Sequence, residues 1–199
     1  MADNSVAVRD PYLWQNDPVL KNRLDIHDEA QLRKAELAFS AARLATLDLG
    51  PRTLGMPWLR HIHFTLFQDI YSWAGELRTI DMWHKETPCC HCEYIETQGN
   101  ALMDELENEH WLSELPQDMF VARLAYYVVE MHVLHPFRAG NGRAQRIFFE
   151  QLALHAGYLL EWSALERDDW NRALNAALDS DGNMDGLHEQ LAKGVSPAR

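Results

Sequence analysis

Apolar residues recur at intervals of three and four along most of this chain, which is the period of an amphipathic helix. The pattern is most regular after Pro57, where the recurring residues are Trp58, Ile62, Leu66, Ile70 and Trp73. Such stretches, bounded by glycine or proline, predict helices over residues 28–49, 57–74, 99–112, 118–134, 143–157, 166–178 and 184–193. We therefore expect a mainly α fold, a helical bundle of about six to eight helices.

The segment from residue 76 to residue 96 breaks the helical pattern. Apolar and polar residues alternate there until Thr87-Pro88 interrupts the run, and a two-residue period is typical of a strand. We interpret residues 76–96 as an irregular β-hairpin flap, and we expect no other strand in the chain. The alternating residues of this flap are Ile80, Asp81, Met82 and Trp83.

The length of the chain favours a single domain. A chain of 199 residues, 47% of them hydrophobic, is long enough to bury one sizeable core. Residues 1–27 carry Pro11 and Pro18 without a helical period, so we expect them to form an irregular N-terminal arm. Residues 158–199 are expected to add the C-terminal helices to the same core.

The formal charge of −12 argues against binding to nucleic acid or to an anionic membrane, because both surfaces are themselves negative. No segment approaches the ~18 uncharged apolar residues that a membrane span needs, and the first residues do not resemble a secretion signal. We therefore expect a cytoplasmic protein.

The three cysteines lie within four positions, at Cys89, Cys90 and Cys92. An odd number in so short a span is no basis for a disulfide framework, which agrees with a reducing compartment. Together with His84 and His91 they suggest a metal site, but zinc-binding cysteines are usually separated by two or more residues. We therefore predict no metal ligand on the protein, and side chains that pack the hairpin or meet solvent.

The most informative segment is residues 135–146, which read His-Pro-Phe-Arg-Ala-Gly-Asn-Gly-Arg-Ala-Gln-Arg and lie between two predicted helices. Gly140 and Gly142 allow the backbone to turn sharply and to bring its N–H groups close to an anion. The helix that follows offers unpaired N–H donors and the positive end of its dipole. This arrangement favours a phosphate, although glycine-rich turns before helices also arise for steric reasons alone.

Three side chains add chemistry to this loop. Arg143 and Arg146 are three residues apart on the new helix, so they share a face on which two guanidinium groups could hold successive phosphates. His135 lies at the other end of the segment, and an unperturbed imidazole, with a pKa of ~6.5, can take up a proton near neutral pH. The segment therefore predicts a phosphate-handling site with its own base.

The same string resembles the signature loop of the Fic family, His-Pro-Phe-x-Asp/Glu-Gly-Asn-Gly-Arg-x-x-Arg, and every position but one is compatible. The stretch Phe67-Gln-Asp-Ile-Tyr-Ser-Trp-Ala-Gly-Glu-Leu-Arg78 is similar to the helix that leads into the target-binding flap of that family. Residues 9–13 and 22–26 resemble the opening of the short stand-alone Fic toxins, which a separate antitoxin inhibits. The resemblance thus covers nearly the whole chain.

This resemblance implies a protein adenylyltransferase, which moves AMP from ATP onto a hydroxyl side chain of another protein. His135 would be the general base, and Phe137, after Pro136, would anchor the loop in the core. The residues implied in binding ATP and its phosphates are Arg138, Gly140, Asn141, Gly142, Arg143 and Arg146. Arg143 would hold the β-phosphate, and Arg146 would reach the γ-phosphate.

The flap has its own role under this resemblance. It would add a strand to an extended segment of the target, so that backbone hydrogen bonds set the register and place the hydroxyl. Short members of the family commonly modify the ATPase subunits of DNA gyrase and topoisomerase IV, which makes a type II topoisomerase the expected target.

One position departs from the family pattern, because Ala139 stands where the loop normally has a carboxylate. That carboxylate helps to hold the Mg²⁺ that bridges the phosphates, so its loss predicts weaker Mg²⁺ binding and reduced activity. A scaffold that binds nucleotide or antitoxin with little transfer activity is the alternative. Relatives that transfer phosphate, UMP or phosphocholine are a further alternative, and the Gly-Asn-Gly run argues against phosphorylation.

A built-in inhibitor is absent from the sequence. Many Fic proteins carry a helix with the pattern Ser/Thr-x-x-x-Glu-Gly/Asn, whose glutamate pairs with the second arginine of the loop. Glu107 is the only glutamate followed by glycine or asparagine here, and Met103, four residues earlier, lacks the required hydroxyl. The resemblance therefore implies a small separate antitoxin, whose glutamate would approach Arg146.

Overall fold

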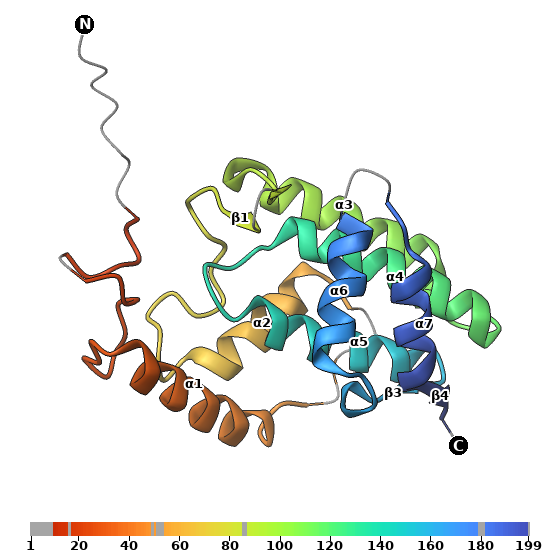
Figure 1. The fold of residues 1–199 in the computed structure, drawn as a ribbon, viewed down its shortest axis with the longest axis horizontal. Coiled ribbons are helices and arrows are strands. Elements are labelled where there is room, and N and C mark those ends of the chain that lie inside the picture. The colour runs from red at the N-terminus through yellow and green to blue at the C-terminus, as the bar shows by residue number, and fades with distance from the viewer. Residues whose placement is uncertain are drawn as a thin grey trace, which may run out of the picture.

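The computed structural model describes residues 10–15, 17–48, 50, 54–84, 87–178 and 182–198, and these form a mainly helical fold (Figure 1). Their seven α-helices confirm the expected fold class. The helices are α1 (Glu29–Leu44), α2 (Met56–Phe67), α3 (Ile95–Asn108), α4 (Gln117–Leu134), α5 (Asn141–His155), α6 (Arg167–Leu178) and α7 (Asp185–Gly194). Short 3₁₀ turns are η1 (Cys92–Tyr94), η2 (His110–Leu112) and η3 (Trp162–Ala164). No helix in the described ranges is long and apolar enough to cross a membrane.

The core is built around α5, which lies between α2 and α4 (Figure 1). One face of α5 is almost completely shielded from solvent, and its buried apolar residues include Ala144, Phe148, Phe149, Leu152 and Ala153. Burying side chains of this size removes a large apolar area from water, which is the main stabilising contribution to such a bundle. The N-terminus of α5, which carries the end of the 135–146 segment, is therefore fixed on a deeply buried helix.

Helix α2 is shorter than its apolar pattern predicts. The helix ends at Phe67, and residues 68–75 continue as a series of turns that close at Gly75. Gly75 has a φ of 80°, and a Cβ at this position would lie 2.9 Å from the Cβ of Phe64, so only glycine fits. Ile70 and Trp73 remain buried in these turns, which explains why their spacing resembled a continuing helix.

The flap contains a much shorter hairpin than expected. β1 (Trp83–His84) pairs with antiparallel β2 (Thr87–Pro88), and residues 85–86 at its tip lie outside the described residues. Ile80, Asp81 and Met82 precede the strand rather than forming it. The carbonyl of Ile80 and the carboxylate of Asp81 accept hydrogen bonds from groups elsewhere at the base of the flap, which leaves them outside the ladder.

A second small sheet corrects the expectation that the flap holds the only strands. β3 (Tyr158–Leu160) pairs with antiparallel β4 (Val195–Pro197), so the chain after α7 returns to the end of α5. Three-residue strands are too short to show a two-residue period, so they could not be predicted from the alternation of apolar and polar residues. The C-terminal region therefore contains α6, α7 and this sheet.

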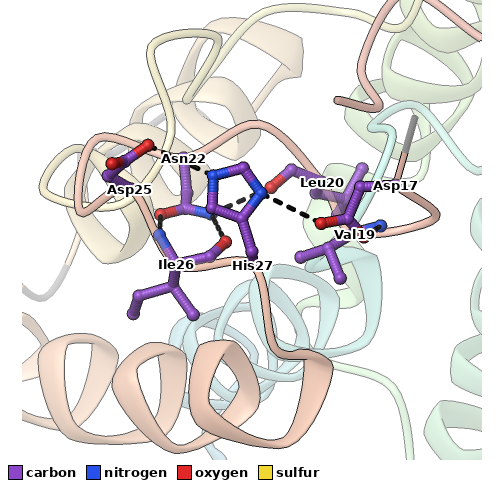
Figure 2. A network of polar contacts seen from close by, with 7 residues as sticks. All are labelled: Asp17, Val19, Leu20, Asn22, Asp25, Ile26 and His27. Atoms are coloured by element: carbon purple, nitrogen blue, oxygen red, sulfur yellow. Dashed lines mark hydrogen bonds and ion pairs between the residues drawn. The ribbon is translucent and has the colours of Figure 1, made fainter. Parts of the chain in front are cut away.

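The N-terminal arm is described from residue 10 onward, except residue 16, and residues 1–9 lie outside the described part. The side chain of Asn22 holds its turn together: the amide donates to the carbonyls of Leu20 and Ile26, and its oxygen accepts from the Ile26 N–H (Figure 2). Figure 2 also shows His27 between Asp17 and Asp25. The arm is thus an ordered turn stabilised by its own polar side chains.

Candidate active site

His135 follows the last residue of α4 and adopts a left-handed conformation, with φ 42° and ψ 62°. Its N–H still donates to the carbonyl of Met131, so the residue caps the helix. Because Pro136 comes next, helical geometry is disfavoured at His135, as the sequence predicts. The left-handed turn directs the chain away from α4 and starts the loop.

The buried side chain of Arg78 ties this loop to the base of the flap. Its Nε donates to the carbonyl of His135 at 2.8 Å, and its terminal nitrogens donate to the carbonyls of Ile80 and Cys90. The backbone N–H of Arg78 donates to the carbonyl of Pro136 at 2.9 Å. Burial lowers the pKa of the guanidinium, which remains charged at physiological pH. One side chain therefore sets the position of both segments.

His63, on α2, holds the middle of the loop in place. Its Nδ1 accepts a hydrogen bond from the N–H of Gly75 at 2.8 Å, so the ring proton is on Nε2, which donates to the carbonyl of Ala139 at 2.9 Å. The ring also stacks on Phe137, with centroids 3.9 Å apart. Burial lowers the pKa of His63 to about 4, which keeps the imidazole neutral and its two hydrogen bonds intact.

The end of the loop is closed by Asn141 and two glycines. The Asn141 side chain accepts from the N–H of Phe137 and donates to the Phe137 carbonyl, at 2.9 and 2.7 Å, and Phe137 itself is fully buried. Gly140 has a φ of 80°, and a Cβ there would lie 2.5 Å from the ring of Phe67. A Cβ on Gly142 would meet no atom within 4 Å, so open space lies beside the first turn of α5.

The start of α5 is suited to an anion. The first N–H groups of a helix have no partner within the helix, and they carry the positive end of its dipole. Gly140 caps the helix without a side chain, so nothing covers these donors from the cap position. The open side at Gly142 leaves room for a phosphate to approach them.

The three arginines of the loop line one cavity of about 700 Å³. Arg138 forms an ion pair with Asp10 of the arm at 2.7 Å, and Arg143 forms one with Glu36 of α1. The guanidinium of Arg146 lies over the ring of Trp162, 5.8 Å from its centroid. The other lining residues are Leu13, Pro18, Val19, Leu20, Glu29, Leu32, Arg33, Leu37, Tyr71, Leu165, Arg167 and Trp170.

A second, smaller cavity of about 180 Å³ adjoins the first and shares Arg146, Trp162 and Trp170 with it. It also contacts Gly142 and His132, so it extends along the first turn of α5. His135 lines neither cavity, although its ring lies close to that of His132, with centroids 5.8 Å apart. The structure therefore brings the loop arginines together around one space, and it places the ring of His135 beside His132, which lines the smaller cavity.

His135 is less basic than an ordinary imidazole, which corrects the expectation of an unperturbed group. Burial, and then the neighbouring charges of His132, Arg78 and His84, lower its pKa to about 4. Its buried Nδ1 has no hydrogen-bond partner in the described structure. The ring is therefore neutral at physiological pH and can accept a proton, but it binds that proton weakly.

The flap residues point to a different part of the surface. Trp83 is 65% exposed, and Asp81 is also exposed, whereas Ile80 and Met82 are half-buried. None of these four residues lines the arginine cavity. They therefore form a surface separate from the arginine cavity, and Arg78 joins the base of the flap to the loop.

Sequence reasoning missed the residues that position this site. Glu36 binds both Arg143 and the hydroxyl of Tyr71, and Arg78 and His63 hold the loop. The available signals were weak: His63 interrupts the apolar face of α2, and Arg78 closes the motif before the flap. No local pattern connects Glu36 with Arg143, which lies 107 residues further along the chain.

A match to the Fic/DOC family covers residues 54–153. The Escherichia coli (strain K12) protein described as "Probable protein adenylyltransferase Fic" is 48% identical to this chain over 198 residues, covering 100% of this chain and 98% of that protein. The chain belongs to the Fic/DOC family. Among Fic/DOC proteins, "Protein adenylyltransferase VbhT" of Bartonella schoenbuchensis is 36% identical over 168 residues, or 82% of this chain and 35% of VbhT.

A solved Fic domain has the same fold. The N-terminal Fic domain of a VirB-translocated Bep effector protein from Bartonella quintana, with bound ADP, superposes with a TM-score of 0.89 at 25% identity. The match covers 94% of this chain and 95% of that one. The relatives named as adenylyltransferases confirm the enzyme class that the resemblance implies for this Fic/DOC chain.

Proposed function

We propose that this chain transfers AMP from ATP to a hydroxyl side chain of a target protein. The observation that carries the proposal is the arginine-lined cavity at the N-terminus of α5, together with the neutral His135, whose ring lies beside that of His132 in the adjoining smaller cavity. A polyphosphate carries several negative charges, and such a cavity offers both guanidinium groups and unpaired backbone N–H donors. The named activity of the relatives supports the same reaction.

The phosphates would occupy the space beside the first turn of α5. Backbone N–H groups of the Gly140–Gly142 run would face the α- and β-phosphates, with Arg143 on the β-phosphate and Arg146 on the γ-phosphate. Arg143 is already held by Glu36, so a phosphate would share or replace this carboxylate. Arg138, paired with Asp10, would contribute positive potential from the side of the arm.

The transfer itself needs only one proton acceptor. The neutral imidazole of His135 would take the hydroxyl proton while the hydroxyl oxygen forms a bond to the α-phosphorus, and the bond to the bridging oxygen of pyrophosphate breaks. The hydroxyl bears the AMP and the histidine bears the proton afterwards. A pKa of about 4 lets the imidazole release that proton readily to water.

The loop residues do not fit a magnesium ion held by the protein. Ala139 has no side-chain oxygen, and its carbonyl is already bonded to His63. Mg²⁺ prefers oxygen ligands and keeps several waters, so it would enter with ATP, bound to phosphates and water. No step of the proposed transfer depends on a protein ligand for this ion.

The remaining parts of the proposal concern partners. The exposed Trp83 and the short β1–β2 hairpin would bind an extended segment of the target by strand addition, with a type II topoisomerase ATPase subunit as the target. The chain would act in the cytoplasm as the toxin of a pair. A small antitoxin would place a glutamate near Arg146, whose guanidinium lies over the ring of Trp162.

A weakened scaffold remains the second candidate, because two observations favour it. Ala139 supplies no carboxylate, and Glu36 places a negative charge against the arginine that would hold the β-phosphate. Such a chain would bind nucleotide or antitoxin and transfer AMP slowly. The two candidate functions differ in the expected rate of AMP transfer, and both use the same cavity.

Incubation with Mg²⁺, ATP labelled at the α-phosphate and a bacterial lysate separates the candidates. We expect labelled protein with the unaltered chain, no label with His135→Ala, and unchanged label with His155→Ala at the exposed end of α5. Ala139→Glu should raise the labelling rate on the order of tenfold by restoring the carboxylate. If only Ala139→Glu labels protein, the chain is a scaffold, and if His135→Ala labels normally, the mechanism is wrong.

A further inference from the structure

Three side chains meet at the base of the flap although they are separated in the sequence. The Asp81 carboxylate lies before β1, and His91 and Cys92 follow β2 at the start of η1. One ligand atom from each of the three lies within 4.8 Å of the other two. It is a cluster of metal-binding groups on the described part of the chain, and it lies apart from the arginine cavity.

The cluster is already organised by contacts within the flap. The Asp81 Oδ2 and the His91 Nε2 are 3.1 Å apart, and Oδ1 of the same carboxylate accepts the backbone N–H of Cys92 at 2.8 Å. Asp81 is therefore oriented by one oxygen while the other faces the imidazole. This is how a carboxylate is held in a metal site, where outer hydrogen bonds orient the ligand.

The donor set selects the kind of ion. A thiolate, an imidazole and a carboxylate are together borderline in softness, which suits Zn²⁺ and its spectroscopic substitute Co²⁺ and does not suit Mg²⁺ or Ca²⁺. In a tetrahedral zinc site the bonds are ~2.0–2.3 Å long, so the ligand atoms are roughly 3.3–3.8 Å apart. The three ligand atoms already lie within 4.8 Å of one another, close to this spacing. We propose that Asp81, His91 and Cys92 bind one Zn²⁺-like ion, with water in the fourth position.

The structure supplies what the sequence pattern lacked. The spacing of Cys89, Cys90 and Cys92 does not match a zinc motif, but the fold adds Asp81 from the other side of the hairpin. A bound ion would join the two sides of the flap at its base. It would complement the hydrogen bond from the Cys89 N–H to the Met82 carbonyl, 2.9 Å long, which spans the same base.

Cobalt titration of the full chain, after EDTA treatment and without nucleotide, tests the site directly. We expect one Co²⁺ per chain with a thiolate-to-cobalt charge-transfer band, displaced by Zn²⁺. Cys92→Ser should abolish the band, whereas Cys89→Ser and Cys90→Ser, which alter neighbouring thiols, should keep it. Asp81→Asn should weaken Zn²⁺ binding by roughly tenfold or more, with unchanged far-ultraviolet circular dichroism.

Hydrogen exchange gives a second readout that does not depend on the thiol. Zn²⁺ should slow exchange of the Cys89 amide in the unaltered chain and not in His91→Ala. Absence of a charge-transfer band in the unaltered chain, or its persistence in Cys92→Ser, would overturn the proposal. Neither readout uses AMP transfer, so the metal site and the proposed activity stand or fall separately.

Discussion

The 135–146 loop and the flap are built in opposite ways, although both are bound by the guanidinium of Arg78. The backbone of the loop is held by Arg78, His63 and Asn141, and its aromatic residue Phe137 is buried. The flap has two residue pairs in its ladder and leaves Trp83 largely exposed. A site that must place reacting atoms needs fixed geometry, whereas a surface that receives an extended peptide needs unpaired backbone.

Removal of Arg78 should break both regions at once and give the largest effect. Arg78→Met leaves the carbonyls of His135, Ile80 and Cys90 without their donors, so we expect the free energy of unfolding to fall by about 3–5 kcal/mol. Urea denaturation measures this loss. Arg172→Met, at an exposed arginine of α6, is the control and should change stability by less than about 0.5 kcal/mol.

The second prediction is that acid destabilises the loop through protonation of His63. The folded pKa of His63, about 4, lies below its unfolded value of 6.5, so the unfolded chain binds the proton first. The contribution of neutral His63 to the free energy of unfolding is therefore complete above pH 6.5 and is lost as the pH falls towards 4. At pH 5 the free energy of unfolding should be about 2 kcal/mol lower than at neutral pH for this reason.

Urea midpoints at pH 7.5 and pH 5 test this, with His63→Gln expected to have a smaller pH dependence than the unaltered chain. His132 and His135 also have pKa values lowered to about 4, so they contribute with the same sign in both proteins. An equal pH dependence in His63→Gln would show that His63 is not held neutral by burial.

The helices of this fold could be predicted because each combines a long apolar period with a glycine or proline boundary. Phe137, Asn141 and the glycines of the loop were identifiable for the same reason, since their pattern is local. Glu36 and Asp10 could not be found, because their arginines are distant in the sequence and any surface glutamate or aspartate has the same local signature. The extent of α2 was overestimated because turns bury Ile70 and Trp73 as a helix would.

The third prediction concerns the charge of the arginine cavity, which can be changed at Glu36 while the size and shape of the side chain are kept. Glu36→Gln keeps an oxygen acceptor for Arg143, offers an amide N–H to the Tyr71 hydroxyl oxygen, and removes one negative charge from the place proposed for the β-phosphate. We expect ATP to bind about fivefold more tightly, because the repulsion between like charges disappears. Calorimetric titration of the variant and of the unaltered chain with ATP measures this difference in affinity.

Glu29→Gln is the matched control for this change. Glu29 lines the same cavity from the first turn of α1 and has no ion pair with Arg143. Its substitution should change ATP affinity less than Glu36→Gln does. Weaker ATP binding by Glu36→Gln would mean that the carboxylate is needed to hold Arg143 for the nucleotide.

The smallest stability effect is expected on the flap. Trp83→Ala should change the free energy of unfolding by less than about 0.5 kcal/mol, because the side chain is 65% exposed. It should raise the KM for a protein target and leave the KM for ATP unchanged. Steady-state labelling with each substrate varied in turn measures both KM values. A change in the KM for ATP would show that the flap also affects nucleotide binding.

The left-handed backbone of His135 places stability in opposition to the proposed role of its imidazole as the general base. Glycine and asparagine tolerate this conformation best, so selection for stability alone would favour one of them at position 135. A chain selected for AMP transfer would retain the imidazole and accept the backbone strain. Substitutions at this position in other members of the family would therefore mark lineages that have kept the fold while abandoning the reaction.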